Sequence, residues 1–91
     1  MDSDWQSILT TLGFRSHGPY GAMRVIIEHV EYLAMETPLG DLEITATYLS
    51  NRSAGQTSTR ASRGATVRHV AEILASQFEQ LRPHMREQGK P

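Results

Sequence analysis

One helical stripe in the second half of this 91-residue chain constrains its fold more than any other feature. Apolar residues recur there mostly at intervals of three or four, as on the buried side of an amphipathic helix: Val67, Val70, Ala71, Leu74, Phe78 and Leu81. The pattern predicts a helix that starts between Thr59 and Ser62 and runs to Leu81. Pro83 is expected to end it, because proline lacks the N–H that a continuing helix needs.

Three more segments favour helices on the same grounds. Residues 4–12 follow a capping box formed by Ser3 and Gln6 and stop before Gly13, which suits a left-handed C-cap. Residues 19–36 begin with a proline and place their apolar residues on one helical face: Met23, Ile26, Ile27, Val30 and Ala34. Residues 42–51 supply a third helix, and residues 50–58 are polar and predict a turn.

These patterns together predict an all-α fold, with no strand, in a compact bundle of four to six helices. The bundle is expected to form one domain over residues 1–83, with a helix-turn-helix at about residues 42–75 and a flexible tail over residues 84–91. The longest apolar run, residues 32–35, is far too short to span a membrane. The absence of cysteine, together with an acidic N-terminus unlike a secretory signal, leads us to expect a cytoplasmic protein.

Catalytic and metal chemistry find little support in the residue pattern. The four histidines are scattered, and there is no cysteine, so no metal site and no cofactor is expected. The serines gather in turn-like stretches, where they cap helices and form turns, and no strand-to-helix elbow presents one as a nucleophile. We therefore expect that the protein is not an enzyme.

The charge is strongly segregated although the net charge is only −1. Residues 1–43 hold seven acidic residues and two arginines, whereas residues 44–71 hold no acidic residue and four arginines: Arg52, Arg60, Arg63 and Arg68. A basic segment on a nearly neutral protein is typical of a local anion-binding face. An ordinary solvated surface is the alternative interpretation.

The arginine-bearing segment coincides with the predicted helix-turn-helix, so double-stranded DNA is the expected partner. Arg52, Arg60 and Arg63 are expected to hold phosphates, because guanidinium groups match phosphate geometry. Ser58 and Thr59 are expected to add phosphate contacts near a helix N-terminus. Ser62 and His69 point away from the predicted core and Arg68 lies at its flank, and all three are expected to face bases or adjoining phosphates in the major groove.

Scattered residues also resemble a known family. Ile44-Thr45, Thr59, Arg68-His69 and Glu72 match, without a gap, the helix-turn-helix of the DNA-binding effector domain of the sporulation master response regulator (the stage 0 sporulation protein A family). Further matches lie upstream, at Ser7-Ile8, Gly13, His17 and Arg24. The resemblance implies a free-standing, all-helical version of that domain that regulates transcription. It also implies that Arg68 and His69 lie on the DNA-facing helix and that tandem copies bind a repeated site.

Two functions therefore follow as hypotheses. The first is a sequence-specific DNA-binding regulator of bacterial, phage or plasmid origin, bound as a homodimer or as tandem copies. The second is a non-enzymatic protein-interaction module that uses the acidic first half or an apolar groove between helices. Salt-dependent DNA titration separates them, because phosphate contacts make affinity fall steeply with salt.

Overall fold

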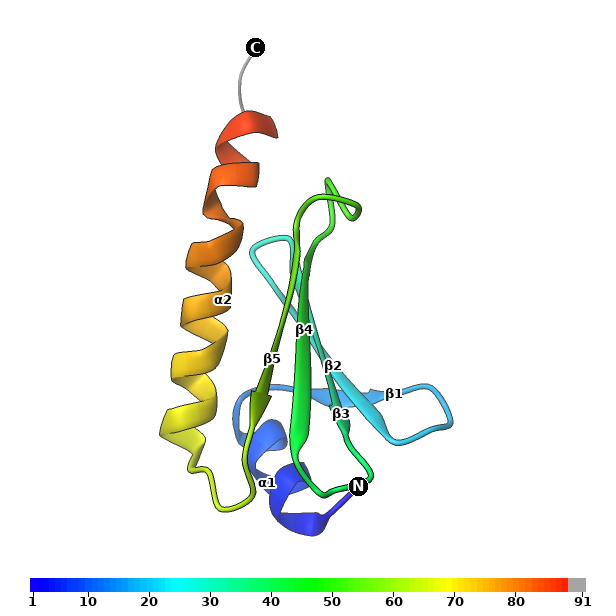
Figure 1. The fold of residues 1–91 in the computed structure, drawn as a ribbon. Helices are drawn as coiled ribbons and strands as arrows, with labels where there is room; N and C mark the ends of the chain where they lie inside the picture. Colours follow the sequence, from blue (N-terminus) through cyan, green and yellow to red (C-terminus); the bar gives the residue numbers. More distant parts are fainter. Residues whose placement is uncertain (89–91) are drawn as a thin grey trace.

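A five-stranded antiparallel sheet, with two helices against it, forms this protein in a computed structural model that describes residues 1–88 (Figure 1). The elements follow one another as α1 (Ser3–Thr11), β1 (Arg15–His17), β2 (Ala22–Ile27), β3 (Val30–Glu36), β4 (Leu42–Tyr48), β5 (Gln56–Ala61) and α2 (Val67–Gln88). The expected all-α bundle is therefore wrong. The helix-turn-helix expected at residues 42–75 is wrong as well, because β4, β5 and their connecting loop fill most of that range.

The sheet is a simple meander in which every strand pairs with its neighbour in the chain, in the order β1-β2-β3-β4-β5. The central strands β3 and β4 pair over seven residues each, from Val30 opposite Tyr48 to Glu36 opposite Leu42. The edge strands differ in length, since β1 pairs over three residues and β5 over six. Figure 1 shows α2 running alongside the sheet and α1 near the end where the β3–β4 turn lies.

The core lies between one face of the sheet and the two helices. The alternating residues of β3 and β4 that face the helices are fully or almost fully buried: Val30, Tyr32, Ala34, Leu42, Ile44 and Ala46. Trp5 and Leu9 from α1 and Val70, Leu74 and Leu81 from α2 complete the cluster. This alternation is the period of a half-buried strand, so burial of one sheet face explains why these segments are extended.

The β2–β3 hairpin replaces the long helix expected over residues 19–36. Its two-residue turn, Glu28-His29, has positive φ values of 50° and 67°, as a type I′ turn requires. Type I′ turns usually carry Asn-Gly, so the Glu-His pair does not predict a turn in the sequence. The main chain of the turn is tied to the residue that follows β4, because the Leu49 N–H donates to the His29 carbonyl oxygen over 2.9 Å.

The helix α2 carries the predicted apolar stripe but is displaced along the chain. It begins at Val67 rather than between Thr59 and Ser62, and it continues through Pro83 to Gln88. The prediction that Pro83 ends the helix is wrong. Leu81 and Met85, on either side of the proline, both pack against the core and so favour the helical path. The remainder of the expected tail, residues 89–91, lies outside the described residues.

Neither helix in the described part of the chain combines the length and the hydropathy that crossing a membrane requires.

Candidate interaction surface

Charged, polar and apolar side chains line the face of the sheet opposite the helices. The register arranges them in rows across the strands, and the central row runs from Arg15 and Arg24 through Leu33 to Thr45 and Ser58. We call this side of the sheet the open face, because the core cluster and both helices belong to the other side. An antiparallel sheet with one solvated face is common, so exposure of this face by itself identifies no ligand.

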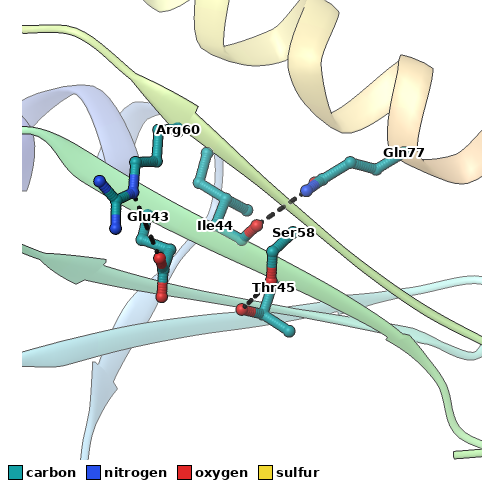
Figure 2. Close-up of polar contacts among 6 residues, drawn as sticks. All are labelled: Glu43, Ile44, Thr45, Ser58, Arg60 and Gln77. Carbon is teal, nitrogen blue, oxygen red and sulfur yellow. Dashed lines mark hydrogen bonds and ion pairs between the residues drawn. The ribbon is translucent and has the colours of Figure 1, made fainter.

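Most charges on the open face are paired within the chain. The Arg24 Nε donates to Glu31 Oε2 over 2.8 Å. The Arg60 Nε donates to Glu43 Oε2 over 3.4 Å, and Figure 2 shows this second pair. Thr45 and Ser58 join their hydroxyl groups over 2.9 Å between these pairs. Each carboxylate offsets one guanidinium charge, so the open face is far from a continuous cationic surface.

The residues expected to bind DNA are dispersed by the sheet. Arg52 lies in the β4–β5 loop, whereas Ser62 and Arg63 lie in the β5–α2 loop, at the opposite end of β5. Ser58 and Arg60 face the open side of β5, and Thr59, paired with the buried Ile44, faces the core. Arg68 and His69 are exposed in the first turn of α2, and Arg68 is 3.4 Å from Glu72. The structure brings these side chains to no common face.

Exposed apolar residues gather instead at the end of the sheet where the β1–β2 and β3–β4 turns meet. Of the six large apolar side chains that are exposed in the described residues, four lie there: Tyr20 (88 % exposed), Leu39 (78 %), Met35 (44 %) and Met1 (39 %). With the exposed Pro38 they make up what we call the end patch. Met1, Tyr20, Met35 and Pro38 also line one open depression of about 310 Å³.

No family model, curated protein or solved structure matches this chain. The resemblance to the sporulation regulator therefore stays a prediction, and the all-helical fold that it implied is wrong. The function has to be argued from the surface itself.

The turns that carry the end patch have a well-defined backbone. Gly21 and Gly40 adopt positive φ values of 81° and 91°, a conformation that glycine reaches without strain. The β3–β4 turn is closed by two main-chain bonds, from Thr37 N–H to the Asp41 oxygen over 2.8 Å and from Gly40 N–H to the Thr37 oxygen over 2.9 Å. Leu39 thus lies on a turn that main-chain hydrogen bonds close.

Acidic residues and one arginine lie beside the end patch. The Glu36 carboxylate accepts the Asp2 main-chain N–H over 2.6 Å and so holds the N-terminal segment beside β3. Asp2 also caps α1 by accepting the Asp4 N–H over 2.8 Å, and Asp41 lies in the same turn as Leu39. The side chain of Arg63 lies against Gly40 in that turn, so the margin of the apolar centre holds one cation beside three acidic residues.

The sequence contained two signals for this surface. The excess of acidic residues over residues 1–43 identified the acidic half, and Gly-Pro-Tyr-Gly and Pro-Leu-Gly, residues 18–21 and 38–40, are typical turn sequences that contain one large apolar residue. The helical interpretation of residues 19–36 hid the second signal. Among the described residues, no group of three or more His, Cys, Asp or Glu side chains is arranged to hold a metal ion.

Proposed function

We propose that this chain is a non-catalytic protein-interaction module and that it binds its partner through the end patch. The observation that carries the proposal is the gathering of four exposed large apolar side chains at one end of the fold. Contiguous exposed apolar surface on a soluble domain marks an interaction site more often than scattered apolar residues do. Tyrosine and methionine are also enriched in the buried centres of protein interfaces.

The margin of the apolar centre indicates the chemistry of the partner. Asp2, Glu36 and Asp41 lie beside the apolar centre, and Arg63 is the cation next to them, so a complementary surface carries apolar side chains flanked mainly by lysine or arginine. Exposed charge pairs contribute mainly to the association rate and little to affinity. Tyr20 and Leu39 are therefore expected to supply most of the binding free energy, and raised salt is expected to slow association.

Affinity capture with paired variants tests this function. The double variant Tyr20→Ser/Leu39→Ser removes the most exposed apolar side chains of the end patch, and the control Ile26→Ser removes an exposed apolar side chain of β2 outside it. A partner is expected to bind the wild-type chain and the control variant alike. Its Kd for the double variant should rise at least about 100-fold, which corresponds to about 2.7 kcal/mol. Partners that bind all three chains equally would refute the proposal.

Binding of double-stranded DNA, and with it a role in transcription, stays a prediction. The protein-interaction function is favoured over DNA binding, because the four arginines of the basic segment lie on different elements: Arg52, Arg60, Arg63 and Arg68. A fluorescence titration with mixed duplex fragments at several salt concentrations tests it. Binding that weakens with salt, and that Arg60→Ala weakens to the same extent for every duplex fragment, would favour DNA.

We also propose the cytoplasm as the compartment, since a chain without cysteine suits a reducing environment.

A further inference from the structure

The outer edge of β5 offers unpaired main-chain groups. The Tyr48 N–H donates to the Gly55 carbonyl oxygen over 2.7 Å, which marks these two residues as a hydrogen-bonded pair of the β4–β5 ladder. Hydrogen-bonded pairs alternate along antiparallel strands, so Thr57, Thr59 and Ala61 bond to β4. The intervening residues direct their N–H and C=O groups away from β4: Gln56, Ser58 and Arg60. In the described part of the chain these three N–H groups have no acceptor.

The two edges of the sheet are protected to different degrees. The edge strand β1 pairs over only three residues, and short edge strands are poor templates for further pairing. The other edge strand, β5, pairs in unbroken register over six residues and contains no proline, no lysine and no bulge. These are devices by which natural sheets block an edge, as are charged side chains, and the one charge on β5, Arg60, is paired with Glu43 of its own chain. The strand β5 therefore remains competent to accept another strand.

We propose that β5 pairs with β5 of a second copy of this chain, antiparallel, about a two-fold axis at Ser58. This register places all outward groups of one strand against those of the other: Ser58 opposite Ser58, and Gln56 opposite Arg60. The intervening pairs join Thr57 to Thr59 on the helix side of the sheet, and cross-strand threonine pairs are favourable. The two five-stranded sheets thereby become one continuous sheet.

The side chains on the open face are complementary in this register. The Gln56 Nε2 donates to Thr47 Oγ1 over 3.2 Å, so the amide oxygen of Gln56 is free to accept a hydrogen bond from Arg60 of the second copy. Arg60 keeps Glu43 as its partner in its own chain (Figure 2). At the two-fold axis the neutral hydroxyl groups of the two Ser58 residues therefore lie opposite each other. Each Arg60 lies opposite the amide of Gln56, so no two like charges lie opposite each other. A foreign strand would have to reproduce this pattern, whereas a second copy carries it already.

The helices also fit the pairing. The helix α2 lies over β4 and β5, and Thr57 Oγ1 donates to Gln80 Oε1 over 2.8 Å. Because α2 contacts the edge strand as well as β4, the two copies of α2 come to lie side by side across the two-fold axis. Ser76 and Gln80, joined over 3.4 Å, are near the axis and are small or polar enough for this approach.

Sedimentation analysis of two proline variants tests the pairing. Ser58→Pro removes the central N–H, which β4 does not use, and edge strands tolerate proline at such positions. Ser16→Pro is the matched control, because Ser16 occupies the outward-pointing position of the opposite edge strand, β1. The wild-type chain and Ser16→Pro are expected to dimerise, and Ser58→Pro should dimerise at least about 100-fold more weakly. A monomeric wild-type chain at millimolar concentration, or a dimer that Ser58→Pro leaves intact, would overturn the proposal.

Cross-linking gives a second measurement that does not depend on how well the proline variant folds. The chain contains no cysteine, so Ser58→Cys introduces a single thiol at the proposed axis. A short bismaleimide should join two Ser58→Cys chains and leave Ser16→Cys chains monomeric. Equal cross-linking of both would refute β5 pairing. The Tyr20→Ser/Leu39→Ser variant should still dimerise, so failure of the end patch and failure of the β5 pairing are distinguishable.

Discussion

Gln77 of α2 donates its side-chain amide N–H to the main-chain carbonyl oxygen of Ile44 in β4 over 2.8 Å (Figure 2). Both residues are completely buried. This bond joins the helix to a central strand inside the core, whereas the bond between Thr57 of β5 and Gln80 of α2 is exposed. The amide oxygen of Gln77 has no hydrogen-bond partner among the described residues, so the glutamine satisfies only one of its two polar ends.

Gln77→Met and Gln77→Ala should therefore differ in stability. Methionine keeps the volume, loses one hydrogen bond worth about 1 kcal/mol and removes the unpaired oxygen, so the free energy of unfolding should change by less than about 1 kcal/mol. Alanine leaves a cavity and should lower that free energy by about 2–4 kcal/mol. Urea unfolding measures both values. Equal destabilisation by the two variants would show that the hydrogen bond to Ile44 outweighs packing.

Trp5→Phe tests how α1 is held against the β3–β4 turn. The Trp5 indole N–H donates to the Gly40 carbonyl oxygen over 2.8 Å, in a partly buried setting. Phenylalanine keeps most of the apolar contact but leaves that oxygen without its donor. We expect a loss of about 1–2 kcal/mol in the free energy of unfolding, measured by circular dichroism because the only tryptophan is removed. No change would mean that water replaces the indole without penalty.

The β2–β3 turn offers a stabilising substitution. Glu28 and His29 occupy positive φ values, and left-handed conformations are unfavourable for residues with a Cβ atom by about 1–2 kcal/mol each. Replacement by Asn-Gly, the preferred type I′ pair, should raise the free energy of unfolding by about 1 kcal/mol. Thermal unfolding of Glu28→Asn/His29→Gly gives the value. A lower melting temperature would contradict the assignment of strain to these two residues.

Stability should fall at alkaline pH because of Tyr32. Burial, and to a smaller extent the nearby Glu28 carboxylate, raises the pKa of the Tyr32 hydroxyl above 10.0 in the folded chain. The unfolded chain then loses this proton at lower pH than the folded chain, so the contribution of Tyr32 is complete below pH 10.0 and is lost as pH rises above it. Urea unfolding between pH 8 and about pH 11 should show this decline.

Tyr32→Phe provides the control for that titration, since it fills the same buried position on β3 without an ionisable group. Its free energy of unfolding should decline less steeply over the same pH range. If both chains lose stability in parallel, other groups cause the alkaline effect.

The sequence predicted two local helical segments correctly. The helix over residues 4–12 is confirmed as α1, and Gly13 has the expected positive φ of 92°. Its N-cap is Asp2 rather than Ser3, a shift of one residue that competing capping side chains readily produce. The apolar stripe of α2 is confirmed as well, with Val70, Leu74 and Leu81 buried. In both helices the pattern lies within one continuous segment, so local spacing suffices to identify it.

By itself, then, the sequence determined the two helices and the segregation of charge between its halves. Residues 42–48 alternate apolar and polar side chains, so the sequence did carry a strand signal there, which the helical interpretation overlooked. Only the tertiary structure decided that residues 22–36 form a hairpin, because their apolar spacing fits a helix until the turn at Glu28-His29 folds β2 against β3. Strand pairing also fixes Arg60 on the open face beside Glu43, whereas Arg63 lies in the following loop and Arg68 in α2. The end patch has the same origin, since it gathers residues from turns that lie far apart in sequence and meet only when the strands align.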